Sequence, residues 1–293
     1  AHARGVKVYV TANILAHNYD LDGVREYLTE LQNMKPDRPD ALIIADPAIF
    51  TIAGEVCPDI DRHISTQANN TNYGTFQFWE KLGATRVVTA RELNLAEIKA
   101  IHDNCDIEIE SFIHGALCYC YSGQCLLSSF QGGRSGNRGR CAQPCRLMYT
   151  PQTSAMPRTK GKGLRGDENR QKDSNGSAYL LSPKDMCGLP VLPDIIEAGV
   201  YSLKIEGRMK NVTYAAGVTS IYRKYTDMYL ENGRKGYHVS QEDKNMLLDI
   251  FNRGSFTSGY YNSEKGKNMM SLSRPNHMGV KALQVVKNDN GRI

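Results

Sequence analysis

The chain alternates short runs of β-branched residues with amphipathic stretches, and this alternation limits its possible folds more than any other feature. The runs occupy residues 6–10, 41–45, 62–66, 86–90, 107–112, 178–182 and 201–205. Helical periodicity marks the segments 20–33, 72–82, 94–102, 183–198, 211–230 and 241–252. A strand followed by a helix, repeated along a chain, is typical of an α/β protein with a parallel sheet.

Seven strands are one fewer than an eight-stranded TIM-barrel-like (β/α) barrel requires. Residues 1–5 resemble the end of a helix that leads directly into a strand, so we expect the first strand and helix of the barrel to be absent. We assign residues 1–275 to this barrel domain. Residues 279–286 start a new strand pattern, and we therefore expect residues 276–293 to open a separate C-terminal β domain.

Cysteines cluster in the middle of the chain. Five fall within 28 residues, and a sixth, Cys187, follows later; the five are Cys118, Cys120, Cys125, Cys141 and Cys145. With Cys120 set aside, the spacing of the first four is C-x6-C-x15-C-x3-C. Thiols gathered in this way form either disulfides or a soft-metal site. The N-terminus shows no secretory signal, so we favour a metal site in a cytoplasmic protein.

Composition excludes a membrane protein, because no apolar run approaches the ~20 residues that cross a bilayer. The net charge of +5 is unevenly distributed. Residues 134–172 hold ten Lys or Arg and two Asp or Glu, a net of +8, which leaves −3 for the remainder. Part of this segment, residues 151–177, is rich in Gly, Lys, Arg and Ser, and we expect a flexible basic insert there. Such a segment is either a solvated loop or a contact for a polyanion such as RNA.

Four sequence segments carry a family resemblance. They are ESFIHGALCYCYSGQCLLS at 110–128, RHISTQ at 62–67, SPKD at 182–185 and KIEGRMK at 204–210. Together they resemble the signature of the peptidase U-thirty-two family, also called collagenase-like peptidases. The resemblance extends over nearly the whole chain except the basic insert, and the bacterial branch that modifies tRNA and rRNA is the most similar.

The resemblance implies a barrel that holds a 4Fe–4S cluster on four cysteines. Members of the family either hydroxylate a pyrimidine in tRNA or rRNA with prephenate as co-substrate, or act in oxygen-independent ubiquinone hydroxylation, and the resemblance implies one of these chemistries. It also implies a second family subunit as a possible partner. The expected ligands are Cys118, Cys125, Cys141 and Cys145, and Cys187 is an alternative to Cys145 because the fourth ligand varies in the family. Cys57, Cys105 and Cys120 are expected to be ordinary buried thiols.

Polar residues on or after the predicted strands complete the candidate site. His114, Glu110 and Glu206 are the candidate catalytic residues, and His114 could instead be a core histidine bonded to backbone. The candidates for substrate binding are His63, Gln67, Arg140, Lys204 and Arg208, since a dicarboxylate requires cationic partners. Glu110 and Glu206 could equally serve as ion-pair partners of these cations. Lys184 and Asp185 are expected to cap a helix that begins at Pro183.

Two other functions remain open at this stage. A peptidase would agree with the family name, but the sequence contains neither an H-E-x-x-H zinc motif nor a G-x-S-x-G nucleophile elbow. A zinc-stabilised RNA-binding module would use the same cysteines, although only Cys141 and Cys145 have the close spacing of a zinc knuckle. Few aromatic residues accompany the basic run, which argues against base stacking by that loop.

Overall fold

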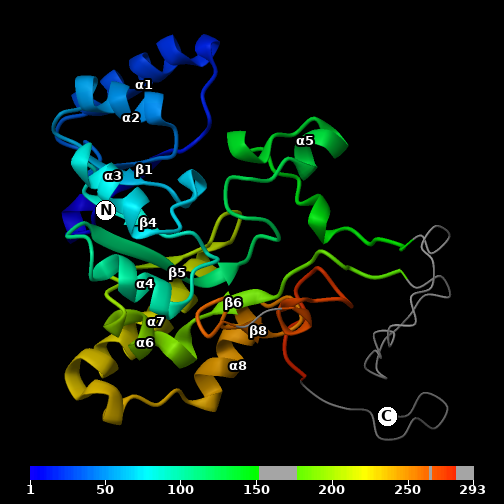
Figure 1. Ribbon diagram of the computed structural model, residues 1–293. Helices are drawn as coiled ribbons and strands as arrows, with labels where there is room; N and C mark the ends of the chain where they lie inside the picture. The colour runs from blue at the N-terminus through cyan, green and yellow to red at the C-terminus, as the bar shows by residue number, and fades with distance from the viewer. Residues whose placement is uncertain (152–176, 264–265, 282–293) are drawn as a thin grey trace, which may run out of the picture.

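A mostly parallel sheet forms the centre of the protein (Figure 1). The computed structural model describes residues 1–151, 177–263 and 266–281. Its strands are β1 Tyr9–Ala12, β2 Ala41–Ile44, β3 Asp61–Ile64, β4 Arg86–Val88, β5 Glu108–Ala116, β6 Asp185–Cys187, β7 Ser202–Ile205 and β8 Phe256–Thr257. Strands β1 to β5 run parallel in sequence order, and β7 pairs in parallel with β5.

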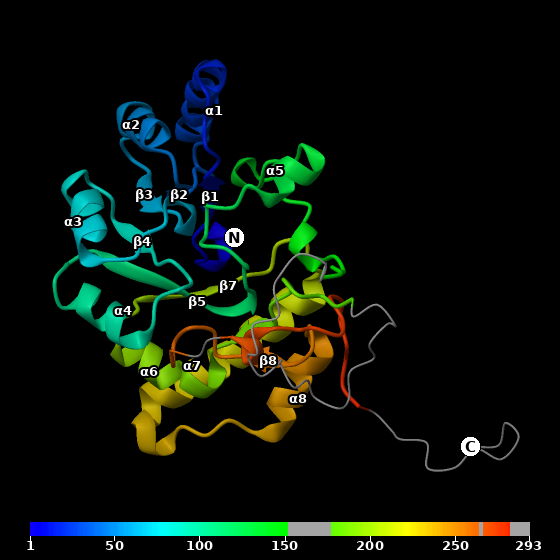
Figure 2. The same ribbon diagram turned by 45° about the vertical axis from the view of Figure 1, so that its right-hand side comes forward.

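Eight α-helices are assigned among the described residues. They are α1 Leu21–Asn33, α2 Pro47–Val56, α3 Tyr73–Lys81, α4 Leu95–His102, α5 Leu127–Gly132, α6 Leu192–Glu197, α7 Val212–Gly236 and α8 Gln241–Ile250. Helices α1 to α4 follow one another around the outside of the strands (Figure 2). None of the helices in the described part of the chain is both long and apolar enough to cross a membrane.

The apolar core lies between the strands and these helices. Strand residues Leu42, Ile44 and Val87 are fully buried against helix residues such as Leu28 and Ile98. Side-chain caps set several helix starts: Asn94 and Glu97 form a capping box at the start of α4, and Asn211 accepts a hydrogen bond at the start of α7. Six of the seven predicted strands and five of the six predicted helices are present, with ends that shift by a few residues.

Two predicted elements are wrong. Residues 178–182 form no strand, and only Ala178 makes an isolated bridge, to Tyr149. The predicted helix over 183–198 begins only at Leu192. The segment before it forms β6, which pairs antiparallel with the end of β5. Asp185 therefore caps no helix: its carboxylate lies 2.6 Å from the Arg253 guanidinium, and this buried ion pair holds the segment extended.

Strand β5 is the organising element of the sheet. Its first residues pair with β4 and residues Glu110 to His114 pair with β7 on the opposite edge. Beyond β4, the strand continues and its last residues pair with β6. Seven of its nine residues are buried. The C-terminal end of β5 is consequently fixed on both edges, and the chain leaves it in a defined direction.

A polar network covers the concave face of the sheet. Arg86 on β4 donates to Glu108 and Glu110 on β5. Its guanidinium also lies 5.4 Å from the ring centroid of Tyr9, on β1, and 5.6 Å from that of Tyr201, which precedes β7. Since β1 is three strands away from β4 in the sheet, these contacts require strong curvature.

The curvature agrees with the predicted barrel-like arrangement. A closed barrel also requires hydrogen bonds between strands at the two ends of the sheet. Among the described residues, β1 pairs only with β2, and no ladder joins β1 to β7. The part of the chain described here is thus an α/β fold with a curved, mostly parallel sheet, and the closed barrel stays a prediction. Residues 152–176 of the predicted basic insert (151–177) and residues 282–293 of the predicted β-domain start (276–293) lie outside the described residues.

Replacing Arg86 tests whether the concave network stabilises the fold. Arg86→Ala leaves the buried Glu110 carboxylate with only Lys204 and Ser202 as partners among the described residues, and we expect a loss of about 1.5–3 kcal/mol in the free energy of unfolding. Urea denaturation measures this loss. The matched control is Arg223→Ala, which removes an exposed pair with Asp227 on α7 and should cost less than about 1 kcal/mol. Equal losses in the two variants would refute the role assigned to Arg86.

Candidate functional site

The clustered cysteines lie on two loops beyond the C-terminal end of β5. Cys118, Cys120 and Cys125 occupy the loop between β5 and α5, and Cys141 and Cys145 follow α5. In Figure 1 this region lies on the right of the strands, around α5. The carboxyl ends of parallel strands are where α/β proteins build their sites, as the sequence predicted for this loop.

The first cysteine loop packs directly on the turn after β3. Gly123 has a φ of +79°, and a Cβ atom at this position would lie 2.1 Å from the carbonyl oxygen of Gln67. Only glycine allows this approach. At the other end of the loop, Gly115 lets the backbone of Glu206 approach equally closely. These two contacts place the cysteine loop between the ends of β3 and β7.

The second loop is tied to the N-terminal part of the chain. Arg138 donates to both carboxylate oxygens of Asp20, at 2.7 and 3.0 Å, and to the carbonyl oxygen of Leu15. Arg208, after β7, donates to the carbonyl oxygen of Gly139. Within the loop, the Ser128 hydroxyl accepts from the backbone of Ala142. The second set of cysteines is thereby held against the first.

The thiols influence one another, which shows that they share one region. Burial raises the pKa of Cys145, and the charges of Cys118, Cys141 and Cys125 raise it further. Burial, with a hydrogen bond to Cys125, raises the pKa of Cys120 to about 11. Cys120 thus belongs to the cluster, although the sequence predicted an ordinary thiol. All eight cysteines are free.

Cys187 lies apart from this cluster. It is buried in β6, where its sulfur accepts from the Tyr222 hydroxyl at 3.6 Å, and burial raises its pKa. The structure therefore brings Cys145, and not Cys187, together with Cys118 and Cys125. Cys57 is a buried thiol that donates to the carbonyl oxygen of Leu28, as expected.

Two guanidinium groups accompany the thiols, and the sequence prediction missed both. Arg146 donates to the carbonyl oxygens of Leu117 and Pro183 and to the Ser182 hydroxyl, and its charge lowers the pKa of Cys145 against the opposing effect of burial. Arg91 has the same effect on Cys118. Its position directly after β4 could have suggested this role, because the segment after each strand points toward the same end of the sheet.

Glu206 lies with Arg91 beside the cysteine loops, and we call these charged groups, together with Arg146, the upper layer. Its carboxylate accepts from Arg91 at 3.1 Å and from the backbone of Arg208 at 3.1 Å. Arg91 also donates to Ser122 in the first cysteine loop. The structure thus brings the candidates Glu206 and Arg208 next to the cysteines. Arg140 lies on the second cysteine loop and is exposed.

Glu110, Lys204 and His63 form a separate, deeper layer on the concave face. The Glu110 carboxylate lies 2.6 Å from the Lys204 ammonium and also accepts from Ser202. Burial opposes ionisation of Glu110, but Lys204, Ser202 and Arg86 outweigh it and lower its pKa. Burial, together with Arg86, lowers the pKa of His63 to about 4. Its Nδ1 atom has no hydrogen-bond partner among the described residues.

His114 faces α7 and is away from both layers. It is 1% exposed, its Nδ1 lies 3.3 Å from the Tyr222 hydroxyl, and its ring packs on Tyr214, Tyr222 and Phe256. Burial lowers its pKa to about 3. The sequence allowed His114 to be either a catalytic residue or a buried core histidine, and this environment suits the second. Its acid–base role stays a prediction.

The donor set suits an iron–sulfur cluster. No three His, Cys, Asp or Glu side chains in the described part of the chain converge closely enough to hold a single metal ion. The sulfur ligands of a cluster bind different irons, so they stand farther apart than four sulfurs around one zinc ion. Thiols are the donor type that such a cluster takes, and the two loops carry five of them.

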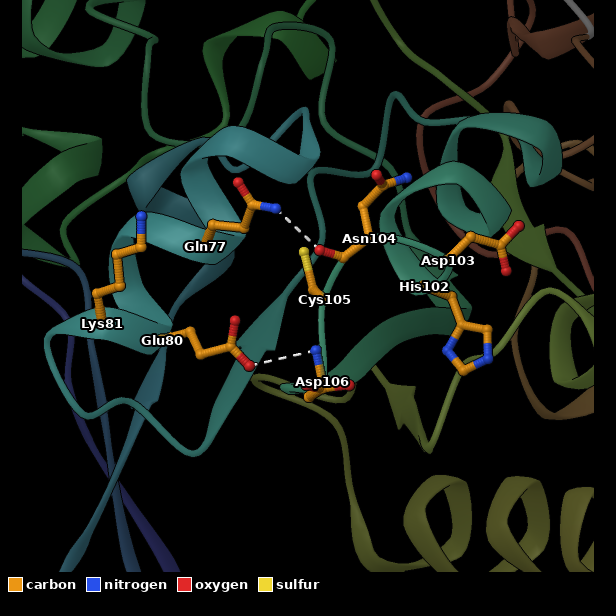
Figure 3. A pocket seen from close by; sticks show the side chains of 8 residues that line it. All are labelled: Gln77, Glu80, Lys81, His102, Asp103, Asn104, Cys105 and Asp106. Atoms are coloured by element: carbon orange, nitrogen blue, oxygen red, sulfur yellow. Dashed lines mark hydrogen bonds between the residues drawn. The ribbon is translucent and has the colours of Figure 1, made fainter.

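A polar hollow on another part of the surface is unrelated to this site. It lies between the C-terminal ends of α3 and α4, before β4 and β5, and hence at the end of the sheet opposite the cysteines (Figure 3). Gln77 donates to the carbonyl oxygen of Asn104, and Glu80 accepts from the backbone of Asp106. These bonds join the helix end to the chain that enters β5, so the hollow has a structural explanation.

Acid denaturation can test the environment of His114. Its folded pKa is depressed to about 3, so an unfolded chain binds a proton below about pH 6.5 that the folded chain does not. Stability is therefore lost as pH falls from about 6.5 toward 3, by about 2 kcal/mol between pH 6.5 and 5. We expect His114→Gln to reduce this pH dependence by that amount in urea titrations. The control His238→Gln, at an exposed residue, should leave it unchanged, and an unchanged slope for His114→Gln would contradict the assignment.

Comparisons with known proteins find similar chains over most of this sequence. The chain is 42% identical to tRNA hydroxylation protein P1 of Bacillus subtilis, over 77% of this chain and 50% of the relative. It is 37% identical to the 23S rRNA 5-hydroxycytidine C2501 synthase of Escherichia coli, over 98% and 41%. It is also 36% identical to an "Uncharacterized protease" of Methanocaldococcus jannaschii, over 92% and 62%.

This chain spans about half the length of these curated relatives. The family model described as "Peptidase family U32" matches residues 1–271, which include both cysteine loops, the curved sheet and α1 to α8. The resemblance seen in the four sequence segments is thereby confirmed, and the chain belongs to peptidase family U32.

Proposed function

We propose that this chain is the catalytic region of an RNA hydroxylase that carries an iron–sulfur cluster and acts on a pyrimidine of tRNA or rRNA. One observation carries the proposal: five thiols gather beyond the C-terminal end of β5 in a chain whose relatives are named for tRNA hydroxylation and for 5-hydroxycytidine synthesis. The family name alone would favour proteolysis, but the sequence contains neither an H-E-x-x-H zinc motif nor a G-x-S-x-G nucleophile elbow.

The proposed ligands are Cys118, Cys125, Cys141 and Cys145. A bound 4Fe–4S cluster would supply one-electron transfer or a Lewis-acidic iron at this end of the sheet. Four thiolates concentrate negative charge, and a thiolate in an apolar site is costly unless a cation is nearby. Arg91 and Arg146 supply that charge, and both are anchored by hydrogen bonds that do not involve the thiols.

Hydroxylation replaces a C–H bond with C–OH, so a co-substrate must both supply the oxygen atom and accept the two electrons that the base loses. We propose prephenate as the co-substrate, as the resemblance implies. Its two carboxylates require cations, and Arg140 and Arg208 lie beside the cysteine loops. Lys204, by contrast, is already paired with Glu110. Glu206, held by Arg91, is the carboxylate best placed to accept a proton near the cysteines.

An analysis of iron, sulfide and zinc in protein purified without oxygen tests the cluster. We expect about four irons and four sulfides per chain with charge-transfer absorption, all lost in Cys118→Ala. Cys57→Ala is the matched control and should retain the iron, because Cys57 is buried at the end of α2, where it donates to Leu28 on α1. Zinc without sulfide would favour the RNA-binding module, and reactive thiols without metal would reopen the peptidase.

Comparison of two further variants decides the fourth ligand. Because Cys145 lies with the other thiols and Cys187 is bonded to Tyr222, Cys145→Ala should lose most of the iron. Cys187→Ala should keep nearly all of it. The reverse result would exchange the two assignments. The activity itself is tested by nucleoside mass spectrometry, in which incubated RNA should gain one oxygen atom on a pyrimidine.

A further inference from the structure

A second pocket adjoins the first cysteine loop and has no role in the site described so far. Its volume is about 260 Å³, and it is lined by Glu92, Asn94, Glu97, Tyr119, Cys120, Tyr121, Tyr260 and Ser263. These residues come from the segment after β4, the start of α4, the cysteine loop and the segment after β8. The pocket therefore opens at the same end of the sheet as the cysteines.

Three of the lining residues are tyrosines, which offer flat aromatic surfaces. Tyr119 and Tyr121 flank Cys120 in the sequence and are 47% and 54% exposed. Large exposed aromatic side chains around a hollow are typical of sites that stack on planar ligands, and nucleic-acid bases are the commonest of these. The two tyrosines lie inside the cysteine motif, which is a signal that the sequence analysis overlooked when it examined only the basic run.

Glu92 provides a polar group that lacks a partner. Burial raises the pKa of its carboxyl group, against the lowering effects of its own backbone, Arg91 and the backbone of Ser122. Its Oε2 atom is buried and has no hydrogen-bond partner among the described residues. A buried carboxylate oxygen without a partner costs free energy, so this atom is prepared to accept a hydrogen bond from a ligand. A ligand that presents a hydrogen-bond donor to Glu92 would satisfy this atom.

The pocket also adjoins the proposed cluster ligands. Cys120 is part of its wall. The Tyr260 phenol lies near enough to Glu92, Tyr121 and Cys118 for their charges to raise its pKa, after the larger effect of burial. A planar ligand in the pocket would consequently lie beside the cysteines on which the proposed chemistry depends.

We propose that this pocket binds one unstacked cytosine base of single-stranded RNA, with the tyrosines against its faces and Glu92 accepting from its 4-amino group. The inference rests on the proposed function for the choice of RNA and of a pyrimidine. Carboxylates accept from the cytosine amine in other nucleic-acid complexes. Uracil has a carbonyl oxygen at the same position, which would face another acceptor. A base inside a duplex could not enter, so the target must be unpaired or extruded.

Binding of short labelled RNA strands tests the proposal without any reaction. The strands differ at one central position, which is cytidine, uridine or an abasic site, and fluorescence anisotropy is measured on the full chain purified without oxygen. We expect the cytidine strand to bind about ten-fold more tightly than the uridine strand. Glu92→Gln should reduce this preference to about two-fold or less, because an amide can both accept and donate. Tyr119→Ala should weaken binding of the cytidine strand but not of the abasic strand.

Matched controls lie away from the pocket. Glu80→Gln changes a carboxylate in the hollow of Figure 3, and Tyr27→Ala removes a half-exposed tyrosine on α1; both should retain the cytidine preference. Equal affinity for cytidine and abasic strands, a preference for uridine, or no RNA binding would each overturn the inference. If protein that contains iron and sulfide binds all three strands equally, the pocket assignment is wrong and the proposed function is unaffected. A cytidine preference without iron would refute the hydroxylase and retain the pocket.

Discussion

The candidate site depends on one constraint, which is that β5 is hydrogen-bonded along both edges. Strands β4 and β7 flank its first part, and β6 continues where β4 ends. Because this leaves β5 no freedom, the chain that follows it must start at one place and in one direction. The close backbone contacts at Gly115 and Gly123 then fix the loop against Glu206 and Gln67. The thiols are thus positioned by a rigid strand and two contacts that only glycine permits.

Charge is arranged in two layers with different consequences. In the deeper layer, Arg86 and Lys204 satisfy Glu110, so the candidate residues there are largely occupied by each other. In the upper layer, Arg91 and Arg146 lie beside thiols whose pKa burial raises. Arg91 is paired with Glu206, and Arg146 donates to the carbonyl oxygens of Leu117 and Pro183. These two cations are the ones on which the thiolates of the proposed cluster would depend.

Much of this could be predicted from local sequence patterns. The alternation of β-branched runs with amphipathic stretches predicted most of the strands and helices. The side-chain periods of a strand and of a helix follow from the backbone of a single element, so a local pattern records them. The motif at 110–128 predicted the family and placed the cysteines after a strand. The errors occur where a residue's partner is distant in the sequence. Asp185 is drawn into a strand by Arg253, 68 residues away, and Cys120 lies near Cys145, on the second cysteine loop. The single-residue functions of His114, Glu110 and the others remain predictions.

The sequence by itself determined the class of fold, the end of the sheet at which the site lies and the chemical nature of its donors. These depend on residue type and on spacing within one element or one loop. Only the tertiary structure decided which residues meet: that Cys145 and not Cys187 lies with the other thiols, that His114 packs against α7, and that Glu92 and three tyrosines form one pocket. The physical reason is that these contacts join strands, loops and helices far apart in the chain, and their geometry follows from the curvature of the sheet, which no local pattern records.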